Sequence, residues 1–460
     1  MAEVGARALV SRLSGEQETG ESMEGHRSGT PDRLSAVHAA RAIADDPKTS
    51  GSTEDEIRKP IVVRVRKFGR LLVIMAIGSL AVTSTSCATS SKPTAPTTTV
   101  PRRPSPPKGS AVPSGFEPGS VSFVSTTTGF VLGVDSSCPA DACVSLARST
   151  DGGSSWVGLP APNAGYVAHG APSTSSLPVV SEVHFADELD GWVFGPALFA
   201  THDGGRTWQE IDLGGSVVSL ETSGGYVDAV VSPCSGEAEC AGPLTLEQAR
   251  ATGGAFATVL TGLSTESSGV GFSYLSFHAS VGFVILSGAL RSPPLLYATQ
   301  NLANPHGWSA FPDPCASVVP SYLGSIVAPD TTVLYSLCTG PGAAGSSDKT
   351  IVMTKNGLST VAGSAPTGGA GGVLAATSSG TLVLATASGA SWLDRSTDGG
   401  RTWSTAAIYD DGGIGFNDLG FITNTQGTVV HGIPGPPANY ESQLLMTSDA
   451  GASWQVVPIG

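Results

Sequence analysis

The chain has 460 residues, of which 13% are charged and 40% hydrophobic, and it contains 59 Gly and 32 Pro. This composition is too apolar for a disordered protein and too rich in turn-forming residues for a helical one. Residues 110–460 contain 8 Lys and Arg against 27 Asp and Glu, a net charge near −19. Because an acidic surface repels phosphate backbones, we expect no nucleic-acid partner.

Residues 58–87 have the pattern of an export signal. Arg64, Arg66, Lys67 and Arg70 come before the apolar run Leu71–Val82, which is short for a membrane span. The run ends at Ser84-Thr85-Ser86-Cys87, which resembles a bacterial lipobox. This resemblance implies a lipid on Cys87 and an exported protein held at the outer side of the bacterial cytoplasmic membrane. Cleavage after Ala88, which would give a secreted protein, and an uncleaved signal anchor are the alternatives.

Two polar segments flank this signal. Residues 1–57 have no sustained apolar period and are predicted to be disordered. Residues 88–115 are dominated by Thr, Ser and Pro, which predicts an extended spacer with no core of its own. The folded part of the chain is therefore expected over residues 116–460.

One eight-residue pattern, S/T-x-D-x-G-x-S/T-W, occurs four times in the folded part. The matching segments are Ser149–Trp156, Thr201–Trp208, Ser396–Trp403 and Thr447–Trp454. The pattern resembles the Asp-box, or BNR, repeat of sialidases and of many propellers that are not enzymes. In such a box the Asp side chain closes a turn, the Gly supplies a positive φ, and the Trp begins the next strand.

We interpret the box residues as structural rather than catalytic. They are Asp151, Gly153 and Trp156, then Asp203, Gly205 and Trp208, then Asp398, Gly400 and Trp403, and finally Asp449, Gly451 and Trp454. The first two boxes start 52 residues apart, the last two 51 apart, and the central gap of 195 holds three degenerate boxes. These lie at Ala251–Ala257, Thr299–Trp308 and Thr354–Thr360. Seven units of this length predict an all-β fold, a seven-bladed β-propeller of four-stranded antiparallel blades.

The first two units show the predicted strand order most clearly. In the first unit we expect strands at Val121–Ser125, Gly129–Val134, Val144–Arg148 and Trp156–Leu159. In the second unit we expect strands at Val180–Phe185, Gly191–Gly195 and Trp208–Ile211, with a turn at Asp187–Asp190.

The cysteine pattern agrees with export to an oxidising compartment. Apart from Cys87 there are six cysteines, and the strand map predicts the pairs Cys138–Cys143, Cys234–Cys240 and Cys315–Cys338. All three predicted bridges would lie on the face opposite the Asp boxes. No CxxC motif and no Cys/His cluster with zinc spacing occurs, so we expect neither a metal nor a cofactor.

The face opposite the boxes is also expected to hold the longest loops and any ligand site. Its candidate ligand residues are Tyr166, His169, Arg291, Tyr409, Asp410 and Tyr440. Aromatic and charged side chains together suit a protein or glycan partner. The predicted molecule is a monomer that meets the membrane only through its lipid anchor.

Two further resemblances bear on function. The sialidase resemblance implies an arginine triad and an F/Y-R-I-P motif, but the motif is absent and most arginines of the propeller lie in or beside boxes. A different glycosidase using carboxylates such as Asp187 or Asp190 stays an alternative. The segment Phe185–Trp208 looks like the photosystem II stability/assembly-factor family, seven-bladed propellers that bind membrane-protein partners without catalysis. The sequence thus favours a non-catalytic binding protein, with a glycosidase, an assembly scaffold and a purely structural envelope protein as alternatives.

Overall fold

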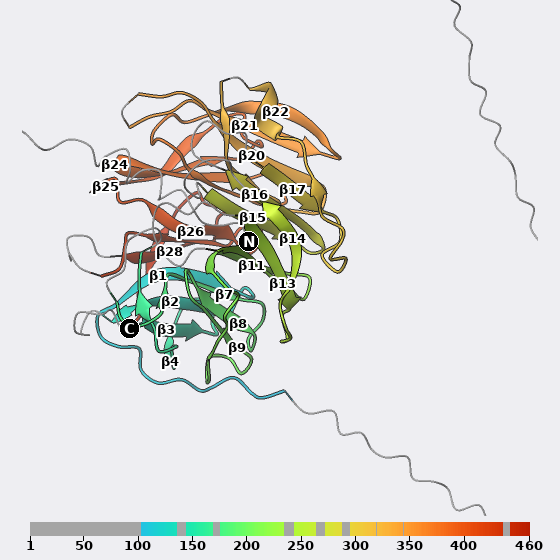
Figure 1. Cartoon of the computed structure of the whole chain (residues 1–460). Coiled ribbons are helices and arrows are strands. Elements are labelled where there is room, and N and C mark those ends of the chain that lie inside the picture. Colours follow the sequence, from blue (N-terminus) through green and yellow to red (C-terminus); the bar gives the residue numbers. More distant parts are fainter. Residues whose placement is uncertain are drawn as a thin grey trace, which may run out of the picture. The chain divides into compact units, whose positions relative to one another are not determined.

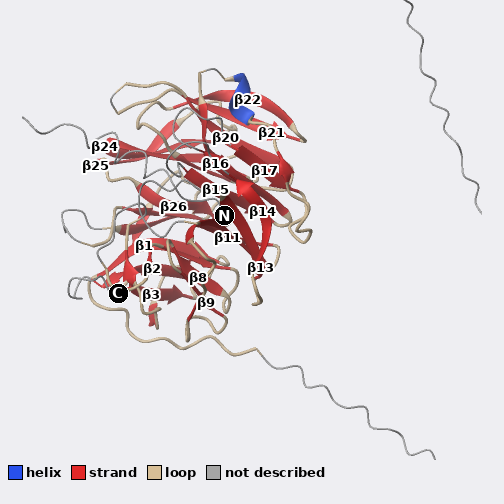
Figure 2. Ribbon diagram, viewed as in Figure 1, coloured by secondary structure: helices blue, strands red, loops and turns tan. Residues whose placement is uncertain are grey.

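The structure is a computed structural model, and it describes residues 103–135, 144–168, 175–233, 243–263, 272–287, 295–318, 320–343, 345–435 and 442–460. Residues 1–102, including the predicted signal and Cys87, lie outside this range. The described chain consists of seven antiparallel sheets that follow one another along the sequence (Figures 1 and 2). Among the described residues no helix is long and apolar enough to span a membrane.

The strands of the sheets are short and follow the sequence in order. The first sheet holds β1 (Phe116–Phe123), β2 (Gly129–Asp135), β3 (Val144–Ser149) and β4 (Val157–Leu159), and the second β7 (Glu182–Phe185), β8 (Gly191–Phe194), β9 (Leu198–Thr201) and β10 (Gln209–Glu210). The third holds β11 (Ser216–Ser223), β12 (Tyr226–Ser232), β13 (Leu244–Arg250) and β14 (Ala257–Leu263), and the fourth β15 (Phe272–His278), β16 (Val281–Ser287), β17 (Leu295–Thr299) and β18 (Ser309–Ala310). The fifth holds β19 (Tyr322–Val327), β20 (Val333–Thr339), β21 (Lys349–Lys355) and β22 (Leu358–Ala365), and the sixth β23 (Val373–Ala376), β24 (Leu382–Ser396) and β25 (Ser404–Gly412). The seventh holds β26 (Phe416–Phe421), β27 (Gly427–His431), β28 (Gln443–Thr447) and β29 (Gln455–Val457), while β5 (Gly165–Tyr166), β6 (Val179–Val180) and the 3-10 helix η1 (Pro314–Ser317) lie between sheets.

The first strands of the seven sheets form a closed ring. Each first strand contacts the first strand of the next sheet, and β26 of the last sheet contacts β1 of the first. The fold is therefore a seven-bladed β-propeller, as the repeat spacing predicts. The first strand of each sheet is an edge strand, and the ring of packed blades leaves only short, protected edges at its centre.

The sixth blade differs from the others because one element replaces its second and third strands. A straight strand of the length of β24 would run for about 50 Å, yet both of its ends lie on the same face. Gly399, just after β24, donates its N–H to the carbonyl of Gly380, just before it, at 3.1 Å. The strand therefore folds back on itself, and Gly389 within it has a φ of +69°. Blade six still presents four strand segments.

Apolar side chains fill the space between neighbouring blades. Phe130 of β2 stacks on Phe185 of β7 with their ring centroids 3.6 Å apart, and both side chains are buried. Each such buried large side chain contributes on the order of 1.5–3 kcal/mol. Hydrogen bonds add direction to this packing. Ser120 accepts the Val183 N–H at 3.0 Å, and Asp418 closes the ring by accepting the Val121 N–H at 2.7 Å.

The end of the predicted spacer packs against the propeller. Ser110 exchanges two backbone hydrogen bonds with Gly158 of β4, at 2.8 and 2.9 Å. Val112 packs into the cluster between the first and last blades, beside Val457 and Ile459. The composition of this segment does not reveal that residues 110–112 pack on a neighbouring core.

Candidate ligand-binding face

The Asp boxes form compact hydrogen-bonded turns between the third and fourth strands of their blades. In the sixth blade, Asp398 accepts the N–H groups of Arg401 and Thr402 at 3.0 and 2.9 Å and the Thr402 hydroxyl at 2.7 Å. Ser396 accepts the Gly400 N–H at 2.8 Å and donates to Asp398. The Asp side chain thus reaches three and four residues along the chain, beyond a simple Asx turn.

The fifth residue of each box, the Gly of the shared pattern, must be Gly for two reasons. Its φ is positive in all four boxes: +91° at Gly153, +83° at Gly205, +93° at Gly400 and +79° at Gly451. It also lies against the preceding blade, since a Cβ on Gly400 would sit 3.0 Å from Ile351. The box therefore fixes a turn and a blade-to-blade contact at once.

The box carboxylates are held in their ionised form. The hydroxyl of Ser453, together with its backbone N–H, lowers the pKa of Asp449 to about 2. The backbone N–H and hydroxyl of Thr402 hold the pKa of Asp398 well below its usual range. An Asp that stays ionised and is saturated with donors cannot serve as an acid catalyst near neutral pH.

Hydrogen bonds from the boxes define the two faces of the propeller. The residue after each box Asp donates its N–H to the turn between the first and second strands, as Gly152 does to Thr127 at 2.8 Å and Gly204 to Leu189 at 3.0 Å. These turns and the boxes make up the box face. The loop face lies at the other ends of the strands and includes residues 195–197, 340–343, 345–348 and 413–415.

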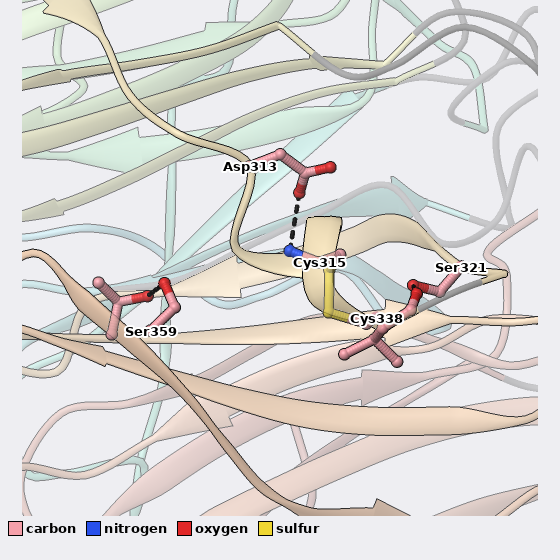
Figure 3. The surroundings of a disulfide bond; sticks show 7 residues. Asp313, Cys315, Ser321, Cys338 and Ser359 are labelled. Carbon is pink, nitrogen blue, oxygen red and sulfur yellow. Dashed lines mark hydrogen bonds between the residues drawn. A yellow bond between two sulfur atoms is a disulfide. The ribbon is translucent and has the colours of Figure 1, made fainter. Parts of the chain in front are cut away.

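A disulfide bond joins Cys315 and Cys338 at the loop face, as the strand map predicts. Cys315 lies in η1 and Cys338 near the end of β20, with their Cα atoms 5.5 Å apart (Figure 3). Asp313 begins η1 by accepting the Cys315 N–H at 2.8 Å. Both sulfur-bearing residues are buried, so the bond holds the entry of blade five from within the core. The other predicted pairs, Cys138–Cys143 and Cys234–Cys240, lie outside the described residues.

Three of the six predicted ligand residues lie in the described part of the chain. Tyr166 lies in β5 and packs over Gly119, where a Cβ would overlap its hydroxyl. Tyr409 and Asp410 lie near the end of β25, and Asp410 is exposed. The remaining three, His169, Arg291 and Tyr440, are outside the described ranges.

Tyr409 borders a polar cluster centred on Asp411. The Asp411 carboxylate accepts hydrogen bonds from the Ser391 hydroxyl at 2.6 Å and from the Gly413 N–H at 2.8 Å, and it pairs with His431 Nε2 at 2.7 Å. The ring of Tyr409 stacks on His431 with centroids 4.2 Å apart. Ser391 and His431 were missed from the sequence, because they are 20 residues either side of Asp411. Pairing of β24 with β25 brings Ser391 to Asp411, and packing of blade seven on blade six brings His431 there.

The geometry of this cluster favours a structural role over nucleophilic catalysis. The Ser391 hydroxyl donates to Asp411 rather than to His431, and its oxygen accepts the Gly415 N–H at 2.9 Å. Ser391 is also fully buried, so no substrate could reach it. Burial alone would raise the pKa of Asp411, but the hydrogen bonds from Ser391, His431 and Gly413 hold it below its usual range. The cluster thus ties blade six to blade seven.

The cavity beside this cluster is too small for a sugar ring. It has a volume of about 30 Å³ and is lined by residues such as Val373, Gly413 and Phe416. That space suits one or two water molecules. In the described ranges, no three His, Cys, Asp or Glu side chains gather in an arrangement that could hold a metal ion. A sugar ring would therefore not fit inside this cavity.

Lys349 fixes the loop that joins blades five and six. Its ammonium donates to the carbonyl oxygens of Gly368 and Gly369, both at 2.8 Å, and of Thr367 at 3.1 Å. The side chain is buried, so its ammonium group is taken up by these hydrogen bonds and does not face solvent.

Charge is distributed unequally between the two faces. Six basic residues lie in the boxes or at the strand ends beside the box turns: Arg148, Arg206, Arg250, Lys355, Arg395 and Arg401. On the loop face, the described residues include one basic side chain, the buried Lys349. Exposed acids on that face are Asp212, Asp348 and Asp410. The described part of the loop face is therefore acidic, and Tyr409 directly precedes Asp410 there.

The fold and the boxes define the chain as a seven-bladed β-propeller with Asp-box repeats. No protein-family model and no curated protein sequence matches it. Among solved structures it is similar to "YCF48 bound to D1 peptide", at 17% identity and a TM-score of 0.47, over 74% of this chain and 95% of that one. It is similar to YCF48 from Cyanidioschyzon merolae at 16% identity and 0.47, over 74% and 98%. It is also similar to the GH74 xyloglucanase from Xanthomonas campestris at 12% identity and 0.29, over 74% and 72%.

Proposed function

We propose that this chain is an exported, lipid-anchored propeller that binds a protein or glycan partner on its loop face and performs no catalysis. Export and the lipid on Cys87 are proposed from the signal pattern of residues 58–87. The rigid ring supplies a fixed platform for the loops, which is where binding residues collect in such folds.

The observation that carries the binding proposal is the acidic loop face. Its exposed Asp348 and Asp410 have no exposed basic neighbour among the described residues of that face. Complementary charge speeds encounter and selects partners. The best-matched partner is therefore a Lys- or Arg-rich protein segment, with a neutral glycan stacking on Tyr409 as the second choice.

An array tests this proposal with the full chain. It would carry Lys/Arg-rich, neutral and Asp/Glu-rich decapeptides together with neutral and sialylated oligosaccharides. We expect retention of the basic peptides, with a weaker signal at higher salt. Equal retention of basic and acidic peptides, or no retention of any probe, would contradict a charge-selective loop face.

The glycosidase alternative meets obstacles at the carboxylates considered for it. Asp187 accepts the N–H groups of Leu189 and Asp190, both at 2.8 Å, and the buried Asp190 pairs with His202 at 2.7 Å. Both belong to a turn on the box face. We expect no turnover of a fluorogenic glycoside panel, sialosides included. Turnover that disappears in Asp410→Asn but survives in Asp398→Asn would favour the glycosidase.

A further inference from the structure

Residues 103–113, here called the strap, run along the outer side of the first two blades (Figure 1). The strap begins at Arg103, which pairs with Asp187 at 2.9 Å and also with the buried Asp190. Both acids belong to the box-face turn of blade two. The chain therefore enters the described structure on the box face of the propeller.

Two box-face arginines hold the strap through its carbonyl oxygens. Arg206 donates to the carbonyl of Ser105 at 2.9 Å, and Arg148 donates to the carbonyl of Pro107 at 2.6 Å. Prolines have no N–H, so a proline-rich segment in extended form is recognised largely through its carbonyls. The buried Arg148 has no other hydrogen-bond partner for its Nε and Nη1 among the described residues. Loss of the strap would leave its charge without an acceptor.

The sixth blade shows what the same motif positions do without a strap. Arg401 matches Arg206 in the box, but it donates to the carbonyl of its own Asp398 at 2.7 Å. Arg395 matches Arg148, but it donates to the carbonyl of Ala450 in the next box at 2.7 Å. In blades one and two, by contrast, Arg148 and Arg206 donate their hydrogen bonds to the strap.

The backbone of blade two also leaves room for the strap. A Cβ on Gly204 would lie 2.9 Å from the carbonyl oxygen of Glu188 and 3.1 Å from Pro107 Cδ, so a side chain there would crowd both the adjoining turn and the proline. At Gly399, the same position in the sixth blade, a Cβ would meet only Tyr335 at 3.5 Å and Arg401 at 4.0 Å. Beyond the prolines, Ser110 extends the sheet at β4. Hydrogen bonds from arginines to the strap carbonyls, an ion pair and strand pairing therefore act together over one continuous segment.

We infer that the box face of blades one and two is a docking surface for a proline-rich peptide, and that its occupant is the chain's own strap. Docking makes the N-terminal tether leave from the box face, so that the acidic loop face is directed away from it. The value of this orientation rests on the proposed function, because it keeps the partner-binding face clear of the anchor. The docking itself does not depend on that function.

Limited trypsin digestion of the full chain tests the docking. Trypsin cuts after Lys108 but not after Arg103, which a proline follows. In Arg103→Ala/Arg206→Ala we expect cleavage after Lys108 to accelerate about tenfold over the parent, the equivalent of about 1.4 kcal/mol. The matched control, Arg401→Ala, should leave the rate unchanged. Equal rates in the parent and the double variant would overturn the inference.

Energy transfer tests the orientation without a membrane. A donor dye at Thr97, introduced with a non-natural amino acid, is paired with an acceptor at Ser155 on the box face or at Asp410 on the loop face. We expect higher transfer to Ser155 than to Asp410, and a smaller difference in Arg103→Ala/Arg206→Ala. Equal transfer to both positions in the parent would overturn the orientation. A parent that passes both tests but fails to bind vesicles would count against the lipid anchor alone.

Discussion

Single residues in this propeller show how the surroundings of an Asp side chain decide whether it is ionised. Asp228 of β12 is fully buried, and one of its oxygens accepts Gln248 Nε2 at 2.9 Å. Burial, reinforced by the nearby Glu221, raises the pKa of Asp228 to about 8, although the Gln248 hydrogen bond opposes this shift. The box aspartates behave in the opposite way because donors surround them. The same side chain is therefore neutral in one place and ionised in another.

Asp228 predicts a specific pH dependence of stability. Its pKa is higher in the folded state than in the unfolded chain, so the folded protein keeps a proton that the unfolded chain releases between pH 4 and 8. Stability from this group is present below pH 4 and is lost as the pH rises toward 8. We expect Asp228→Asn to exceed the parent in stability, by a margin that grows to a few kcal/mol (~2–4) at pH 8.

Thermal unfolding at pH 5 and pH 8 measures this margin. Asp410→Asn, which removes an exposed carboxylate, serves as the control and should follow the parent at both pH values. A parallel loss of stability in the parent and Asp228→Asn between the two pH values would show that Asp228 is ionised in the folded protein.

At the scale of the element, the turn between the third and fourth strands dictates much of the blade. Local chemistry fixes that turn, and for this reason the sequence predicts it well even in degenerate boxes. Asn356 and Gly357 join β21 and β22 with positive φ values of 51° and 78°, the requirement of a two-residue hairpin. The fold-back inside β24 was not predictable, because no turn motif of comparable strength marks Gly389.

The two functions of the box glycine can be separated by substitution. Gly357→Ala should lower the free energy of unfolding by about 1–2 kcal/mol, the cost of a positive φ alone, because nothing lies within 4 Å of its added Cβ. Gly400→Ala has the same cost, and its added Cβ would also crowd Ile351 in the neighbouring blade. Urea unfolding should give a loss at Gly400 about twice that at Gly357. Equal losses would mean that the box glycine serves the turn alone.

The Cys315–Cys338 bond gives a second prediction for an element. It closes a loop with a sequence separation of 23 residues, for which chain entropy predicts about 3 kcal/mol of stabilisation. The Cys315→Ala/Cys338→Ala variant should lose that amount in urea unfolding. Cys87→Ala, which alters a cysteine outside the propeller, is the control. An unchanged midpoint in the double variant would show that packing alone holds the entry of blade five.

At the scale of the whole molecule, the spacing of the boxes along the sequence predicts the ring of blades. The polar cluster around Asp411 and the docked strap are seen only in the folded structure. Box spacing implies seven blades because each box marks one blade, and the structure confirms that number. The cluster of Ser391, Asp411 and His431 had no local signature, since its members come from separate strands. The strap was likewise hidden, because proline-rich composition describes a free segment and not the surface that receives it.

We propose that the loop face binds its partner through its acidic residues. Calorimetric titration with the basic peptide best retained on the array measures that binding. We compare the parent, Asp348→Lys/Asp410→Lys on the loop face, and Glu210→Lys on the outer strand β10, whose side chain is also exposed. We expect at least tenfold weaker binding in the double variant, equivalent to about 1.4 kcal/mol, and little change in Glu210→Lys. Equal affinity in all three proteins would contradict it and move the binding site off the loop face.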